Sequence, residues 1–183
     1  MKRVLVPLAD GFEEIEAITI IDILRRAGAE VVAAGLKKRN VEGSHGLHLV
    51  ADNVLAECLS DSWDLIVLPG GVPGTPNLMA DSRVLDLIKR HNTHGGLTGA
   101  ICAAPAVLDE VGITEGKAVT SHPSWSEKII KGRHTHVRVA EDEDLVTGQA
   151  AGSAMEFAFR LVAKLYGPNK VDEINAGVLA KEI

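Results

Sequence analysis

The sequence has little of what a nucleic-acid-binding or membrane-spanning protein needs. Its largest basic cluster is the triplet Lys37-Lys38-Arg39 and its formal net charge is -6, so a nucleic-acid surface is disfavoured. No apolar stretch approaches the roughly 20 residues of a membrane span, and the chain opens on a strand-like run at residues 4–8 rather than on a charged leader. We therefore expect a cytoplasmic protein with neither nucleic acid nor a membrane as its partner.

Cysteine is also scarce. The only two cysteines, Cys58 and Cys102, are far apart in the sequence, so they do not make a disulfide framework and they suit a reducing compartment. The histidines other than His122 form loose pairs without a nearby cysteine, and no H-E-x-x-H pattern occurs. We therefore expect no metal site.

Strand-like and helical segments alternate through most of the chain. A strand-like run at residues 4–8 is followed by an amphipathic segment at 14–27 and a second strand-like run at 30–36. This order is typical of an α/β protein with a mostly parallel sheet and helices on both faces. The length and the 46% hydrophobic content fit one domain over residues 1–183. Further strands are expected at 64–68, 97–101 and 117–121, and further helices at 83–91, 124–131, 152–166 and 170–180.

Two short segments predict antiparallel pairing. Residues 41–54 alternate in short pieces, and we expect Leu47, Leu49 and Val50 to pack inward. Residues 136–140 and 145–147 flank an acidic turn and are expected to form a small β-hairpin.

Cys102 stands where a predicted strand meets a predicted helix. Small residues precede it, and Pro105 suits the first turn of the helix that follows. This pattern is similar to the nucleophile elbow, in which a sharp turn lifts one side chain above the sheet edge. Backbone amides and the helix dipole at such a turn favour the thiolate, which makes a cysteine nucleophilic. The alternative is a buried structural cysteine, whose pKa burial would raise.

Three other segments should lie beside Cys102. In open parallel sheets, ligands bind beyond the carboxyl ends of the strands. That rule selects the loop and first helical turn at residues 10–16, the turn Pro69-Gly70-Gly71 and His122. Together with Cys102 they supply a nucleophile, a carboxylic acid, free amides and an imidazole, which are the components of thiol catalysis on carbonyl groups.

Each of these components also has a structural interpretation. The carboxylates of the segment 10–16 could merely complement a helix N-terminus, and among them Glu16 is the candidate for facing the core edge. The turn Pro69-Gly70-Gly71 could simply end a strand. His122 could hydrogen-bond to the backbone at a strand end.

Four blocks of the sequence resemble the signatures of the ThiJ/PfpI superfamily, and in particular its branch of Parkinson-disease-type protein deglycases. These blocks are residues 11–16 (GFEEIE), 68–71 (LPGG), 100–105 (AICAAP) and 120–123 (TSHP). The resemblance covers nearly the whole chain. It implies a flavodoxin-like three-layer sandwich, usually present as a homodimer.

The resemblance also implies roles for individual residues. Cys102 would be the nucleophile, Glu16 would hydrogen-bond its sulfur and move a proton, and His122 would be the nearby imidazole. Backbone amides of Gly71 and Ala103 would form the oxyanion site.

The activity implied is that of a cofactor-free glyoxalase III or protein deglycase. Cys102 would attack methylglyoxal, glyoxal or their early adducts on proteins. A redox sensor or holdase chaperone that uses an oxidisable Cys102 is the alternative. An intracellular cysteine peptidase is disfavoured because no acidic residue stands beside His122 in the sequence.

The sequence departs from the family at the edge of the expected pocket. Many relatives carry arginine at the position of His45, and some carry another at the position of Gln149. A neutral His45 would hold an anion less firmly than the fixed guanidinium fork. We nevertheless keep His45, Gln149 and Gly70 as candidate substrate-pocket residues.

Overall fold

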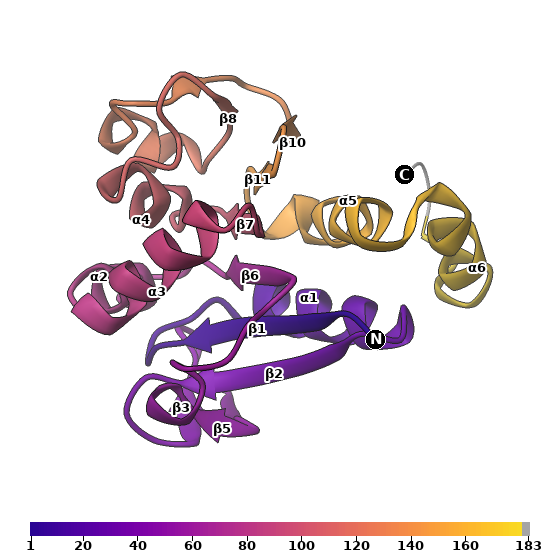
Figure 1. The fold of residues 1–183 in the computed structure, drawn as a ribbon, viewed down its shortest axis with the longest axis horizontal. Coiled ribbons are helices and arrows are strands. Elements are labelled where there is room, and N and C mark those ends of the chain that lie inside the picture. Colours follow the sequence, from indigo (N-terminus) through magenta and orange to yellow (C-terminus); the bar gives the residue numbers. More distant parts are fainter. Residues whose placement is uncertain (181–183) are drawn as a thin grey trace.

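The computed structural model describes residues 1–180, which form an α/β fold (Figure 1). The first half contains β1 (Arg3–Leu8), α1 (Glu14–Arg26), β2 (Glu30–Gly35), β3 (Asn40–Glu42), β4 (His48–Val50), β5 (Asn53–Val54), the 3-10 turn η1 (Leu55–Glu57), β6 (Leu65–Leu68), α2 (Gly74–Met79) and α3 (Ser82–Thr93). The second half contains β7 (Leu97–Ile101), α4 (Pro105–Glu110), β8 (Ala118–Val119), η2 (Pro123–Lys128), β9 (Arg133–His134), β10 (Val139–Asp142), β11 (Leu145–Gly148), η3 (Ala151–Ser153), α5 (Ala154–Tyr166) and α6 (Pro168–Val178).

The main sheet has seven strands in the order β10-β11-β7-β6-β1-β2-β5. All neighbours pair in parallel except β10, which runs antiparallel to β11 as the sequence predicted. In Figure 1 the arrowheads of β1 and β2 point to the same side of the molecule. The carboxyl ends of the parallel strands therefore share one edge, and the expected α/β architecture is confirmed.

Helices cover both faces of this sheet and close two hydrophobic cores. Side chains alternate between the faces of a strand, so Val4 and Val6 of β1 point to one core and Leu5 to the other. The first core is completed by α1 and α5, which lie against each other. The second is completed by α3 and α4. Within residues 1–180, no helix is long and apolar enough to cross a membrane.

The segment expected as a strand at 117–121 does not join the main sheet. Only β8 is formed there, and it pairs with β9 in a separate two-stranded sheet. N–H groups of this segment donate to side chains of the β10–β11 hairpin. The Ala118 N–H donates to Asp142 Oδ2 (2.7 Å), and the Thr120 N–H donates to Thr147 Oγ1 (2.9 Å).

The helix expected at 124–131 is instead the shorter 3-10 turn η2. It ends at Lys128, after which the N–H groups of Ile130 and Lys131 both donate to the Asp109 carboxylate (3.0 Å each). These bonds to a side chain replace the helical bonds that a longer helix would need.

The antiparallel pair predicted within 41–54 is present as β3 and β4, but its packing was predicted wrongly. Leu47 and Val50 are 64% and 73% exposed, and only Leu49 is half-buried. In a strand of period two, residues on either side of an inward side chain point outward, so Leu49 and Val50 cannot both pack inward. The pattern also gave no indication of β5, which adds an edge strand to the main sheet.

Phe157 of α5 tests the first core. Its side chain is fully buried, and a Cβ on Gly99 or Gly148 would come within 3.2 or 3.1 Å of its ring, so the ring packs directly on β7 and β11. We expect Phe157→Ala to lower the free energy of unfolding by about 3–5 kcal/mol in urea denaturation, because a cavity replaces the ring. Leu179→Ala, at a side chain that is 77% exposed, is the matched control and should change it by less than about 0.5 kcal/mol. Equal effects of the two substitutions would contradict this core assignment.

Candidate active site

Cys102 lies at a sharp turn between β7 and α4. Its φ is +65°, in the left-handed region that non-glycine residues seldom adopt. Its N–H donates to the Gly148 carbonyl oxygen (2.9 Å), and its own carbonyl oxygen accepts the N–H of His122 (2.8 Å). Neighbouring segments therefore hold the strained turn in place. This is the elbow geometry that the sequence predicted.

Glu16 reaches the same place from the first turn of α1. Its N–H donates to Glu13 Oε2 (2.7 Å), which caps the helix, and its fully buried side chain accepts the N–H of Gly70 at Oε2 (2.8 Å). The other oxygen, Oε1, is buried with no hydrogen-bond partner among residues 1–180. A polar atom left in this state is costly, and such atoms occur at functional sites.

Gly70 permits the close approach of Glu16 to Cys102. A Cβ at position 70 would lie 2.9 Å from Glu16 Oε2 and 2.8 Å from Cys102 Cβ, and no real side chain tolerates such contacts. Gly70 is buried and lies behind the site rather than in the pocket wall. Its contribution is therefore to leave room for the two reactive groups.

The two reactive groups both have raised pKa values. Burial raises the pKa of Glu16 from 4.5 to about 7, although the Gly70 N–H and the thiol oppose the shift. Burial, with the negative charge of Glu16, raises the pKa of Cys102 from 9.0 to about 12, and the Ala103 N–H offsets only part of this rise. The easily ionised thiol expected from the sequence is therefore not found. The carboxyl ionises first and can then accept the thiol proton.

Gly71 and Ala103, whose backbone amides the family resemblance implies as the oxyanion site, line the same pocket as Cys102. The N–H of Gly71 donates to no residue that the structure describes, and that of Ala103 faces the sulfur. Gly71 has a φ of +102°, and a Cβ there would lie 2.4 Å from Gly11 O and Glu13 N. Only glycine therefore fits at this position. The two amides stand where an oxygen anion on a carbon bound to Cys102 could be stabilised.

Cys102 opens into a pocket of about 340 Å³. Of the residues predicted for the site, Gly71, Ala103, His45 and His122 also line it. Gln149 does not; its N–H donates to Arg138 O (2.9 Å) just after β11. Glu13, from the segment 10–16 that the sequence selected, lines the pocket as well. The sequence did not indicate four further lining residues, which are Ser44, Val72, Ser124 and Trp125.

Trp125 is the most informative of the lining residues that the sequence did not indicate. It belongs to η2, the turn that His122 caps, and the ammonium of Lys128 lies 3.9 Å from its ring centroid. The position of Trp125 just after the block 120–123 was the one available indication. A helix was expected over residues 124–131, and the Trp125 ring was not assigned to the pocket.

His45 is anchored to the buried carboxylate of Glu14. Glu14 Oε1 accepts the N–H of His45 (2.6 Å), and Oε2 lies 2.9 Å from His45 Nδ1. Burial acts to raise the pKa of Glu14, but these bonds outweigh it and lower the pKa to about 2. The same bond raises the pKa of His45, which therefore carries positive charge more readily than the neutral imidazole assumed from the sequence.

Glu13, Glu14 and His45 also bring potential metal-ligand atoms within 4.8 Å of one another. Both oxygens of Glu14 already accept hydrogen bonds, from the backbone and side chain of His45 and from Ser44 Oγ (3.2 Å). The bonds of Glu14 hold the loop between β3 and β4 against α1.

The imidazole of His122 is turned toward Ser124. Its Nδ1 lies 2.7 Å from Ser124 Oγ and 3.2 Å from Ser124 N. Within residues 1–180 these are the hydrogen-bond partners of the ring, and neither is a carboxylate. His122 borders the pocket but has no acidic residue to orient it as a triad base.

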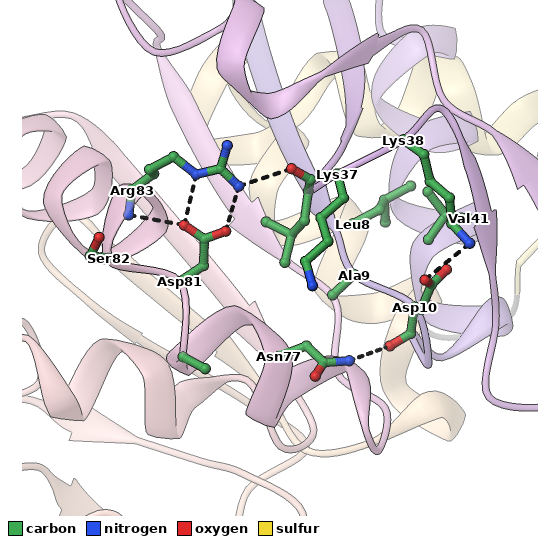
Figure 2. Close-up of a pocket in the computed structure, with 12 residues that line it drawn as sticks. Leu8, Ala9, Asp10, Lys37, Lys38, Val41, Asn77, Asp81, Ser82 and Arg83 are labelled. Carbon is green, nitrogen blue, oxygen red and sulfur yellow. Dashed lines mark hydrogen bonds and ion pairs between the residues drawn. The ribbon is translucent and has the colours of Figure 1, made fainter.

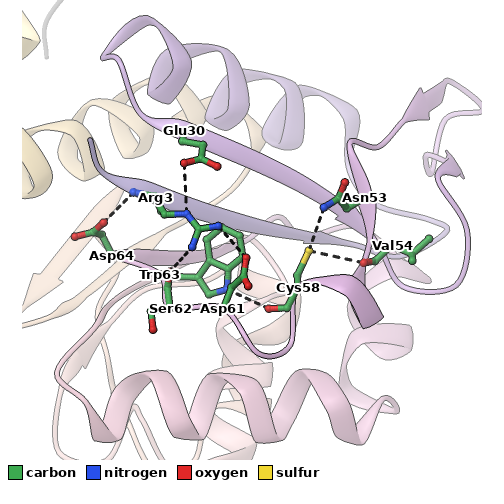
Figure 3. Close-up of polar contacts among 9 residues, drawn as sticks. All are labelled: Arg3, Glu30, Asn53, Val54, Cys58, Asp61, Ser62, Trp63 and Asp64. Carbon is green, nitrogen blue, oxygen red and sulfur yellow. Dashed lines mark hydrogen bonds and ion pairs between the residues drawn. The ribbon is translucent and has the colours of Figure 1, made fainter.

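Cys58 stands apart from this site, in the cluster shown in Figure 3. Its side chain is 1% exposed, with Sγ 3.7 Å from Val54 O and 4.0 Å from Asn53 Nδ2. Burial raises the pKa of its thiol. Trp63 Nε1 donates to its carbonyl oxygen (3.4 Å), and the Arg3 guanidinium stacks on that indole at 4.6 Å from the ring centroid. Cys58 is therefore a structural cysteine.

A thiol on a strand-to-helix turn, beside a buried carboxyl at the edge of an open parallel sheet, defines an α/β protein with a cysteine-centred site. A family model described as the DJ-1/PfpI family matches residues 2–164. Protein dj-1beta of Drosophila melanogaster is 40% identical over 182 residues, which cover 97% of each chain. The chain therefore belongs to the DJ-1/PfpI family, within its DJ-1 branch.

Two other relatives are informative, one through the activity in its name and one through its greater length. A protein named "Glutathione-independent glyoxalase DJR-1.2" from Caenorhabditis elegans is 35% identical over 173 residues, or 93% of this chain and 91% of that protein. Protein DJ-1 homolog A of Arabidopsis thaliana is 38% identical over 184 residues, which cover 98% of this chain but only 47% of that relative.

Solved structures match the whole architecture. The crystal structure of Drosophila melanogaster DJ-1beta superposes with a TM-score of 0.96 at 39% identity, covering 99% of each chain. A structure described as oxidized Toxoplasma gondii DJ-1 also gives 0.96, at 35% identity and full coverage of both chains.

Glu16→Gln tests the cost of burying the carboxyl. Its pKa is about 7 in the folded chain against 4.5 for an unperturbed glutamate, so the folded state holds the proton longer and stability falls as pH rises from about 4.5 through 7. A neutral amide does not ionise, so the stability of the Gln variant does not fall in this way. We expect Glu16→Gln to be more stable than the wild type at pH 8, by up to about 3 kcal/mol, with the gap closing near pH 4.5. Urea denaturation at both pH values measures it, and a gap that does not change with pH would contradict the raised pKa.

Proposed function

We propose that this protein is a cysteine-dependent, cofactor-free glyoxalase III or protein deglycase. Its substrates would be methylglyoxal, glyoxal and their early adducts on proteins. The observation that carries the proposal is a strained, pocket-facing Cys102 beside a buried Glu16 whose pKa is about 7. A general base works best when its pKa lies near the operating pH. The name of the Caenorhabditis elegans relative, a glutathione-independent glyoxalase, supports the same chemistry.

The first step forms a hemithioacetal. Cys102 Sγ attacks the aldehyde carbon of methylglyoxal while ionised Glu16 accepts the thiol proton. The raised pKa of the thiol makes this coupled transfer necessary, since little free thiolate is present at neutral pH. The amides of Gly71 and Ala103 stabilise the oxygen anion that forms. This oxygen then takes the proton that Glu16 accepted, which leaves Glu16 ionised again.

The second step moves hydrogen from the sulfur-bearing carbon to the neighbouring carbonyl carbon. A base removes the proton on the sulfur-bearing carbon, and the oxygen of the neighbouring carbonyl takes a proton, which gives an enediol. The neighbouring carbon then receives a proton and the hydroxyl on the sulfur-bearing carbon loses one, which gives a thioester of lactate without any external oxidant. Glu16 is the proposed base for this shuttle, which is supported by its Oε1 having no hydrogen-bond partner among residues 1–180. Water then cleaves the thioester, which releases lactate and restores the thiol. Glyoxal gives glycolate by the same route.

The pocket wall supports small or protein-borne substrates. Trp125 and Val72 supply apolar surface, and His45 supplies a positive charge when protonated. The pocket volume of about 340 Å³ is at the lower end of ligand pockets, which suits a three-carbon dicarbonyl.

A redox-sensing or holdase role for Cys102 is the second candidate. The same thiol is partly accessible, and a protonated Glu16 could donate to an oxidised sulfur. A peptidase triad has less support because the His122 ring pairs with Ser124.

Lactate formation from methylglyoxal without glutathione tests the enzyme. Cys102→Ala should abolish turnover, and Glu16→Gln should lower kcat roughly 10²- to 10⁴-fold because the base is lost. In the wild type, kcat/KM should rise with pH through about 7 as Glu16 loses its proton, and residual activity of Glu16→Gln should lack that inflection.

Cys58→Ala is the matched control and should retain full turnover, since this thiol is buried away from the pocket. Absence of turnover in the fully reduced wild type, together with stoichiometric peroxide uptake at Cys102, would reject the enzyme and favour the sensor.

We also propose that two copies of the chain associate through α1 and the β3–β4 hairpin. Ile15 and Ile18 of α1 are 59% and 50% exposed. Ile18, Leu49 and Val50 border one hollow of about 250 Å³, so the exposed side chains of the two elements form a joint apolar surface. A second copy would cover this surface with the equivalent side chains of its own.

Sedimentation velocity of the purified chain tests this association. The wild type should sediment as a dimer and Ile18→Glu as a monomer, because the charge would be buried at the interface. Leu179→Glu, at an apolar residue that is 77% exposed and lies outside this hollow, should remain dimeric. A monomeric wild type would rule the proposal out.

A further inference from the structure

A second hollow lies at the carboxyl edge of the sheet and shares no lining residue with the Cys102 pocket. Its volume is about 390 Å³, within the range of small-molecule sites. Leu8 at the end of β1 and Leu36 just after β2 form part of an apolar floor with Val41, and all three side chains are buried. In open parallel sheets, this edge is where ligands bind.

Two closed ion pairs stand on opposite sides of this hollow (Figure 2). On one side, the Arg83 guanidinium lies 2.6 Å from Asp81 Oδ2 and also donates to Leu36 O (3.0 Å). On the other side, Lys38 Nζ lies 3.2 Å from Asp10 Oδ2. Each of these four charges is therefore already balanced by its partner.

Among the residues that the structure describes, Lys37 is the one charged residue of the lining without such a partner. Figure 2 shows its side chain extending between the two ion pairs, toward the side of the hollow where Asn77 lies. Its Nζ forms no ion pair or hydrogen bond with any residue from 1 to 180. Three cationic and two anionic side chains line the hollow, which leaves a single net positive charge at Lys37.

Asn77 adds a fixed polar group. Its Nδ2 donates to the Asp10 carbonyl oxygen (2.9 Å), which orients the amide at the rim of the hollow. The second hydrogen of that Nδ2 is not used by any hydrogen bond among the described residues. A bound oxygen anion could therefore be met by an ammonium and an amide above an apolar floor.

We propose that this hollow binds a small organic monocarboxylate with a short apolar body. One uncompensated ammonium balances one negative charge, whereas a dianion would leave excess negative charge beside Asp10 and Asp81. The carboxylate pairs with Lys37, and the apolar body lies on Leu8, Leu36 and Val41. The site is separate from the thiol chemistry and does not depend on it.

Benzoate, benzyl alcohol and phenyl phosphate are suitable probes because they share an aromatic ring and differ in charge. Two-dimensional amide NMR of the full chain should show benzoate shifting Lys37, Asn77 and Arg83. Benzyl alcohol and phenyl phosphate should bind more weakly. Cys102→Ala should bind benzoate as the wild type does, which separates this site from the thiol pocket.

Lys37→Ala should weaken benzoate binding at least roughly fivefold, the factor expected for one partly exposed charge pair, and Lys37→Glu should abolish it. Lys89→Ala is the matched control, since this lysine lies on α3 outside the hollow. Equal binding of benzyl alcohol, equal weakening by Lys89→Ala, or benzoate shifts confined to other parts of the chain would each overturn the proposal.

Discussion

The close approach of Glu16 to Cys102 is the constraint on which the rest of the site depends. A carboxyl and a thiol can share so small a space because position 70 has no side chain, and a Cβ there would lie within 2.9 Å of both groups. Burial then raises both pKa values, so the pair keeps a proton that two isolated groups would lose. Strain at the left-handed Cys102 and a carboxyl oxygen with no hydrogen-bond partner in the described part of the chain are the local costs of this arrangement. The two packed cores offset them.

The sequence predicted most of the architecture because each element there had a distinct period or boundary. The run at 64–68 and the helical spacing at 152–166 both correspond to observed elements, β6 and α5. The prediction failed where side chains took over backbone hydrogen bonds. Asp142 and Thr147 bind the N–H groups around β8, and such long-range partners leave no periodic trace in the sequence.

The sequence predicted which residues form the site better than it predicted their pKa values. The elbow at Cys102 and the buried Glu16 followed from local pattern and from resemblance to a family. The raised thiol pKa did not, because it depends on how deeply the sulfur is buried and on the charge of Glu16, which lies far away in the sequence. Likewise, the sequence could not show that Glu14 binds His45 and so favours its charged form.

Three consecutive residues at the start of α1 point into three different environments. Successive side chains on a helix are rotated by about 100°, so Glu14, Ile15 and Glu16 face different directions. Glu14 braces the loop that carries His45, Ile15 points to solvent, and Glu16 reaches the thiol. A small rotation of this single turn would displace all three at once. The position of the carboxyl at the thiol and the position of the loop that carries His45 are therefore coupled through one helical turn.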